Sequence, residues 1–259
     1  MLDEGEGQPV LLLHGFPDSS QGWRHQVEAL AATGMRAIVP DLRGFGESDK
    51  PIGVEQYGIG RSVADMVCVL DELGIRRTHV VGHDWGAVLA WSLAAFVPAR
   101  VERLVALSVG HPQTYREPSL EQRAKGWYQL LFQFEGVAEE LLVRDEWRLF
   151  RELLDGARDT ERFLTDLSRP GALTAALNWY RANSDPHHEL APRQDFPSVS
   201  APTLALWSSG DAYLTEGPML ESARCVTGPW RYERIDGVGH WLQVDAPARV
   251  NELLLEFLA

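Results

Sequence analysis

The sequence is poor in cysteine and contains no long apolar run. Cys68 and Cys225 are its only cysteines, which excludes a disulfide framework and makes a reduced, cytoplasmic compartment the expected location. No apolar run approaches the roughly 20 residues that cross a bilayer. The first residues are acidic, whereas a signal peptide begins basic and then becomes apolar. We therefore expect a soluble protein that does not enter a membrane.

Basic residues are also few. Lys and Arg total 24 against 37 Asp and Glu, which gives a formal net charge of −13. This balance repels phosphate backbones and anionic membrane surfaces, so nucleic acid is not an expected partner. No group of residues has the spacing of metal ligands, so no metal is expected either. The 45% hydrophobic content suffices for a sizeable core in a chain of 259 residues.

Short apolar runs and amphipathic segments alternate in the first 110 residues. Runs without polar alternation are typical of strands buried on both faces of a parallel sheet. The order of elements therefore predicts an α/β fold with helices on both faces of the sheet. The predicted strands are 10–13, 37–39, 78–81 and 101–107, and the predicted helices are 20–32, 59–73 and about 86–97.

The alternation stops after Gly110 and resumes at Pro202. Between them, amphipathic helical stretches rich in Trp, Phe and Tyr replace the strands. After them, strands are predicted at 202–207 and 232–235 and helices at 217–225 and 247–258. This order predicts one α/β domain built from residues 1–110 and 196–259, interrupted by a helical insertion at residues 111–195.

The string Gly82-His83-Asp84-Trp85-Gly86 lies between a predicted strand and a predicted helix. Glycines two positions either side of a central residue permit a tight turn that lifts the central side chain above the sheet. A carboxylate, with an ordinary pKa of about 3.9, is already ionised at neutral pH and can attack an sp³ carbon directly. Asp84 is therefore predicted to form an alkyl ester, which a second group must hydrolyse. The alternative is that Asp84 only caps the helix.

Four strings in this order resemble the α/β-hydrolase superfamily, and within it the epoxide hydrolase family whose nucleophile is an aspartate. The resemblance covers nearly the whole chain and implies a mostly parallel sheet with an inserted helical lid. The strings are HGFP at 14–17, DLRGFGES at 41–48, GHDWGA at 82–87 and GVGHW at 237–241.

The resemblance implies a role for each of several residues. His240 matches the general base, and its ordinary pKa of about 6.5 suits proton transfer near neutrality. Asp211 matches the acid that orients this imidazole, and residues 108–111, where related dehalogenases sometimes carry that acid, contain no carboxylate. The backbone N–H groups of Phe16 and Trp85 match the donors of an oxyanion hole. The alternatives are that His240 has only a structural role and that Asp211 only forms a turn.

Tyr128 and Tyr180 match the two lid tyrosines that hold the oxygen of an epoxide in this family. A phenol with a pKa near 10 stays protonated at neutral pH and can donate that hydrogen bond, although either tyrosine could simply pack in the core. Trp85, Phe16, Trp179 and Phe132 are expected to line the substrate site. The expected reactants are a small apolar epoxide and water, without a cofactor, and a homodimer is left open.

Two other functions remain open at this point. A haloalkane dehalogenase shares the aspartate nucleophile but needs N–H donors for the halide, of which Trp85 could supply one. A non-catalytic ligand-binding protein could share the fold, although it would not need Asp84, His240 and Asp211 together.

Two structural expectations complete the sequence-based predictions. Members of the family carry strands ahead of the first one predicted at 10–13, so the leading edge of the sheet is expected to be missing or truncated. Cys68, among apolar neighbours on a predicted helix, is expected in the core.

Overall fold

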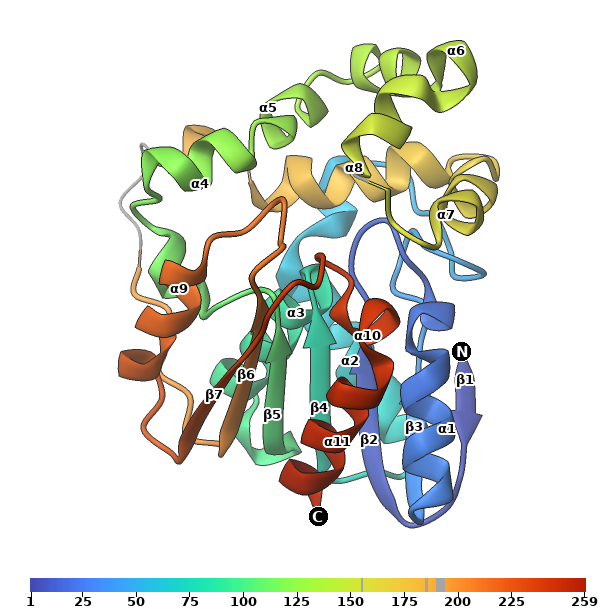
Figure 1. The fold of residues 1–259 in the computed structure, drawn as a ribbon. Coiled ribbons are helices and arrows are strands. Elements are labelled where there is room, and N and C mark those ends of the chain that lie inside the picture. Colours follow the sequence, from blue (N-terminus) through green and yellow to red (C-terminus); the bar gives the residue numbers. More distant parts are fainter. Residues whose placement is uncertain (155, 185, 190–193) are drawn as a thin grey trace.

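Apolar runs of the chain form one sheet in this computed structural model, which describes residues 1–154, 156–184, 186–189 and 194–259 (Figure 1). Residues 155, 185 and 190–193 of the predicted insertion lie outside the described residues. Among the described residues the sheet has seven strands in the order β1-β3-β2-β4-β5-β6-β7, all parallel except β1. The strands are β1 (Leu2–Glu4), β2 (Gln8–Leu13), β3 (Met35–Val39), β4 (Thr78–His83), β5 (Val101–Leu107), β6 (Thr203–Ser208) and β7 (Trp230–Ile235).

Helices cover both faces of this sheet, as the alternating pattern predicts. Successive side chains of a strand point to opposite faces, so Val10 and Leu12 of β2 enter one core whereas Leu11 and Leu13 enter the other. This is why continuous apolar runs form the central strands. The first core is covered by α1 (Arg24–Ala32), α10 (Leu242–Asp245) and α11 (Pro247–Leu258); α2 (Ile59–Glu72) and α3 (Trp85–Phe96) cover the second core, and α9 (Glu216–Glu221) packs beside β6.

The expectation about the leading edge needs one correction. A strand does precede β2, but it is only three residues long, and it pairs antiparallel with β3. The sequence pattern did not indicate this strand because its residues are mostly acidic. An edge strand can leave such side chains in water. Asp3 of this strand forms an ion pair with Arg36 of β3 at 2.7 Å.

Cys68 is exposed, so its predicted place in the core is wrong. Met66 and Leu70 of α2 are buried. Cys68 lies two residues from each of them, which at 3.6 residues per turn places it on the opposite face of the helix.

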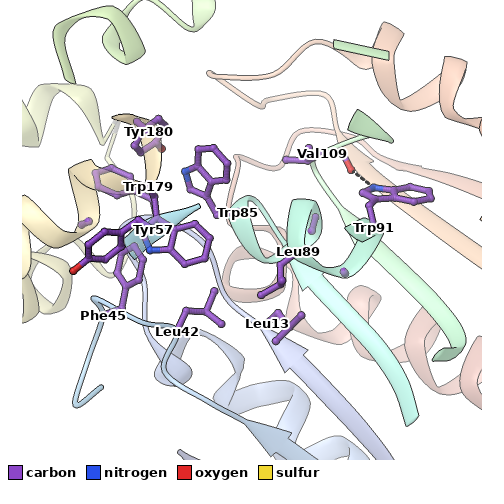
Figure 2. Close-up of a cluster of buried hydrophobic side chains, with 14 of the residues drawn as sticks. Leu13, Leu42, Phe45, Tyr57, Trp85, Leu89, Trp91, Val109, Trp179 and Tyr180 are labelled. Atoms are coloured by element: carbon purple, nitrogen blue, oxygen red, sulfur yellow. Dashed lines mark hydrogen bonds between the residues drawn. The ribbon is translucent and has the colours of Figure 1, made fainter. Parts of the chain in front are cut away.

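Five further helices, which we call the inserted helices, lie across the carboxyl ends of the strands (Figure 1). The buried cluster on the α3 side of the sheet continues into them. Figure 2 shows Trp85 of α3 beside Tyr180 of α8, with ring centroids 5.2 Å apart. The inserted helices are α4 (Leu120–Lys125), α5 (Tyr128–Phe132), α6 (Val137–Leu153), α7 (Thr160–Leu167) and α8 (Ala172–Asn183).

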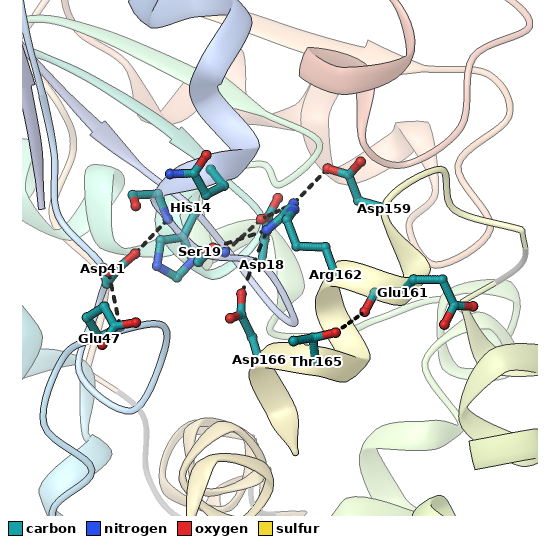
Figure 3. Close-up of polar contacts among 12 residues, drawn as sticks. His14, Asp18, Ser19, Asp41, Glu47, Asp159, Glu161, Arg162, Thr165 and Asp166 are labelled. Atoms are coloured by element: carbon teal, nitrogen blue, oxygen red, sulfur yellow. Dashed lines mark hydrogen bonds and ion pairs between the residues drawn. The ribbon is translucent and has the colours of Figure 1, made fainter. Parts of the chain in front are cut away.

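A buried ion pair ties the inserted helices to the loop after β2 (Figure 3). Arg162 of α7 donates hydrogen bonds to Asp18 Oδ1 at 2.7 Å and to Ser19 Oγ at 3.0 Å. The side chain of Asp18 is completely buried, whereas that of Arg162 is 25% exposed. Asp159 also accepts from Arg162, at 2.7 Å. The pair therefore joins α7 to the loop that carries Phe16.

None of the described helices is long and apolar enough to cross a membrane.

We predict that Arg162→Met lowers the free energy of unfolding by about 3 kcal/mol, because it leaves the carboxylate of Asp18 buried without a cation. Urea unfolding of both proteins measures this loss. Glu161→Gln on the same helix is the matched control. It breaks an ion pair with Arg151 that lies in water, so it should cost no more than about 1 kcal/mol. Equal losses in the two variants would contradict the prediction.

Candidate active site

Asp84 lies at the turn where β4 ends and α3 begins. Its backbone has φ 52° and ψ −122°, which non-glycine residues rarely adopt. The two flanking glycines are required because backbones approach closely: a Cβ on Gly82 would lie 2.2 Å from the carbonyl oxygen of Gly86, and a Cβ on Gly86 would lie 2.0 Å from that of Leu13. The Asp84 side chain makes no capping hydrogen bond to α3. The helix-cap alternative therefore finds no support.

The carboxylate of Asp84 points to the loop after β2 and to His240. The backbone N–H of Phe16 donates to Asp84 Oδ1 at 2.7 Å, and His240 Nε2 lies 3.7 Å from Oδ2. Gly15 allows this approach, since a Cβ there would lie 2.3 Å from the Cβ of Asp84. Burial alone would raise the pKa of Asp84, but the hydrogen bond and charge of His240 and the N–H of Phe16 lower it. Asp84 is therefore ionised at neutral pH.

His240 lies between two carboxylates. Its Nδ1 is 2.8 Å from Oδ2 of Asp211, which follows β6. The other oxygen of Asp211 accepts from the backbone N–H groups of Tyr213 and Leu214 at 2.8 and 2.9 Å. Burial alone would lower the pKa of His240, but the charge and hydrogen bond of Asp211, together with Asp84, raise it to about 10. The imidazole is thus a cation at neutral pH.

The predicted set of Asp84, His240 and Asp211 is brought together, but the residues that hold its loop in place were missed. His83 Nε2 lies 2.9 Å from the carbonyl oxygen of His240, and Ser108 Oγ donates to the same oxygen at 3.2 Å. Burial and the charge of His240 lower the pKa of His83 to about 3, so His83 stays neutral with its donor on Nε2. The sequence did offer one indication of this role: His83 is a polar residue at the end of a buried strand.

Tyr128 and Tyr180 come from α5 and α8 and face Asp84. Their ring centroids are 5.9 Å apart, and both side chains share a cavity wall with Asp84. Burial raises the pKa of Tyr128, and the negative charge of Asp84 raises it further. Burial, the neighbouring phenol and Asp84 likewise raise the pKa of Tyr180. Both phenols therefore remain protonated and can donate.

Two cavities meet at Asp84, Tyr128 and Tyr180. The larger has a volume of about 740 Å³ and the smaller about 20 Å³. The larger is lined by the mostly apolar residues Trp85, Val88, Val109, Tyr115 and Leu214 and also by polar residues that include Gln113, Arg116 and Arg123. The smaller is lined by Phe16, Pro17, Leu153, Leu154, Tyr213, His240 and Trp241.

The expectation that Trp179 and Phe132 line the substrate site needs correction, since neither borders these two cavities. Both are fully buried. Phe132 packs behind Phe16, with ring centroids 5.6 Å apart. Trp179 packs against Trp85 at 5.8 Å and donates its indole N–H to the carbonyl oxygen of Arg43. They support the wall rather than form it.

A turn that raises an ionised aspartate above a mostly parallel sheet, beside a histidine and an acid, defines a hydrolase of the α/β class. Residues 8–247 match the α/β-hydrolase fold family. The chain belongs to this family.

Several similar proteins are named epoxide hydrolases. Epoxide hydrolase A of Mycobacterium tuberculosis is 35% identical, with 100% of this chain and 93% of that protein aligned. Epoxide hydrolase 3 of Xenopus tropicalis is 35% identical over 96% of this chain and 71% of that protein. The crystal structure of epoxide hydrolase A from Mycobacterium thermoresistibile superposes with a TM-score of 0.86 at 32% identity, covering 99% of this chain and 93% of that one.

We predict that His240 loses its proton only as the pH approaches about 10, and that Asp84→Asn and Asp211→Asn each lower this midpoint. The shift should be larger for Asp211, whose carboxylate is nearer. Because the folded pKa exceeds the unfolded value of about 6.5, the ion pairs stabilise the fold fully below that pH and lose this contribution as the pH rises toward 10.

Titration of ¹⁵N-labelled histidine by NMR measures this midpoint. His83 is the internal control, because it should stay neutral throughout the range. An unchanged His240 midpoint in both asparagine variants would refute the assignment.

Proposed function

We propose that this protein is an epoxide hydrolase, which converts an epoxide to a vicinal diol through an ester on Asp84. The observation that carries the proposal is the meeting of an ionised carboxylate with two protonated phenols at the end of a cavity of about 740 Å³. An epoxide needs both at once: a nucleophile for a ring carbon and a proton donor for the ring oxygen. The names of the similar proteins point to the same reaction.

In the first step, a carboxylate oxygen of Asp84 forms a bond to one ring carbon and the bond from that carbon to the ring oxygen breaks. The released oxygen takes a proton from Tyr128 or Tyr180. The product is a hydroxyalkyl ester, and Asp84 loses its charge. His240 then has only one neighbouring carboxylate, so its pKa falls and its proton can pass through solvent to the phenolate.

In the second step, neutral His240 takes a proton from a water molecule that adds to the ester carbonyl of Asp84. The smaller cavity touches both groups, and its volume of about 20 Å³ is enough for one water molecule. The N–H groups of Phe16 and Trp85 would stabilise the resulting oxyanion, each by about 3 kcal/mol. The bond from the tetrahedral carbon to the substrate oxygen then breaks, and this oxygen takes the proton of the hydroxyl that the water supplied. The diol leaves, and Asp84 and His240 return as an ion pair.

We also propose that residues 111–195 form a lid inserted between core segments 1–110 and 196–259, because the inserted helices supply both phenols. The acidic composition and the two free cysteines support a cytoplasmic location.

Haloalkane dehalogenation is the second candidate. One observation favours it: the indole N–H of Trp85 is buried and makes no short hydrogen bond among the described residues, so it could donate to a halide. It does lie near enough to the phenol of Tyr180 to lower the pKa of that phenol. Phe16, however, has no side-chain donor to complete a halide site, and this reaction needs no phenols. A non-catalytic binding protein is disfavoured because His240 keeps hydrogen-bond geometry with Asp211 and faces Asp84.

We predict that Asp84→Asn lowers kcat at least about a thousandfold, because the nucleophile is gone. His240→Gln should instead form the ester and fail to hydrolyse it. Mass spectrometry of this variant, mixed with an accepted epoxide, should show protein heavier by one epoxide, with the added mass on the peptide that contains Asp84.

The control for this experiment is His187→Gln, which changes another of the 8 histidines, an exposed one, and should leave no adduct. A single turnover of the unmodified enzyme in water labelled with heavy oxygen should place the label in Asp84 rather than in the diol. A label found only in the diol would exclude the ester route.

We predict that Tyr128→Phe and Tyr180→Phe each slow ester formation, by about a hundredfold, because each removes one donor to the ring oxygen. Removal of both should abolish it. Diol formation and halide release, assayed side by side with an epoxide and the matching chloroalkane, separate the two candidate reactions. Halide release that survives in the double variant, with no diol from the parent enzyme, would favour the dehalogenase.

A further inference from the structure

The two cavities beside Asp84 differ greatly in size. They end at the same three residues, Asp84, Tyr128 and Tyr180, so an epoxide held by these residues has one cavity on each side. One side offers about 740 Å³ and the other about 20 Å³. Sites for drug-sized ligands have volumes of about 300–1,000 Å³, so the larger cavity accepts a sizeable substituent.

The smaller cavity leaves far less room for a substituent than the larger one. It can hold a water molecule, and His240 and Asp84 both border it, so it is the place for the hydrolytic water of the second step. An alkyl group placed there would displace that water. Leu154 and Trp241 in the wall of this cavity are buried, and the hydroxyl of Tyr213 donates to the carbonyl oxygen of Leu153 at 2.6 Å.

We propose, on the basis of the proposed function, that the substrates are terminal epoxides. One ring carbon carries a single large substituent and the other is an unsubstituted CH₂ group. The substituent is apolar next to the ring, where Trp85, Val88 and Leu214 form the wall of the larger cavity. Leu153 and Leu154 determine this specificity, because they line the narrow side on which a second substituent would lie.

Two epoxides that differ by one methyl group test the proposal. The first is a terminal epoxide with a hexyl substituent, and the second carries the same hexyl group on one ring carbon and a trans methyl group on the other. The unmodified enzyme should have a kcat/KM at least about tenfold higher for the terminal epoxide, since one methyl group in a closed site is worth about that factor.

Leu153→Ala and Leu154→Ala should each reduce this ratio about three- to tenfold, because each opens the smaller cavity. Leu153 is only half-buried, so its variant keeps the test valid if Leu154→Ala fails to fold. Leu130→Ala is the matched control: it removes the same atoms from the wall of the larger cavity and should leave the ratio unaltered.

Calorimetry with Asp84→Asn measures the affinity of the site for each epoxide without turnover. Tighter binding of the terminal epoxide supports the proposal if this preference is lost when Leu153→Ala is added to Asp84→Asn. This holds even if the unmodified enzyme forms no diol from either epoxide, because that result would reject only the proposed function. Equal kcat/KM values and equal affinities for the two epoxides would overturn the inference. So would a ratio that changes in Leu130→Ala but in neither alanine variant of the smaller cavity.

Discussion

The site depends on one buried arrangement of charges, in which the imidazolium of His240 lies between the carboxylates of Asp84 and Asp211. Buried charges are tolerated only when they are paired and hydrogen-bonded. Here the backbone supplies the remaining partners: the N–H of Phe16 for Asp84 and two N–H groups for Asp211. The arrangement also links the two chemical steps. In the proposed reaction, alkylation of Asp84 removes one of the charges that keep His240 protonated. His240 can then act as the base of the second step.

Backbone packing at the carboxyl ends of the strands makes that arrangement rigid. Gly82 and Gly86 lie where a Cβ would collide with a neighbouring backbone, and Gly15 lies where a Cβ would collide with Asp84 itself. On the other side of the site, His83 at the end of β4 holds the carbonyl group of His240. Asp84, His240 and Asp211 are thus each fixed by a strand end or by the loop that follows one, which is the place where a parallel sheet gathers residues distant in sequence.

The inserted helices decide what reaches these groups. They bring two phenols over Asp84 and divide the space around it into one large and one small cavity. Their attachment is partly electrostatic, because Arg162 of α7 reaches the buried Asp18 of the Phe16 loop. The attachment of the inserted helices and the position of the Phe16 N–H donor therefore depend on the same few residues.

The sequence by itself determined the features that local chemistry encodes. Continuous apolar runs specified the central strands, and paired glycines specified the turn at Asp84. The last of the four strings located His240, and the position just after the strand at 202–207 located Asp211. The tertiary structure alone decided the features that depend on packing between distant segments. Two of these features are the polar edge strand β1 and the exposed face of α2 that carries Cys68. The others are the burial of Trp179 and Phe132 behind the cavity wall and the contact of His83 with His240. The unequal division of space around Asp84 belongs with them, because a cavity is the volume left between side chains from many elements, and no single segment contains it.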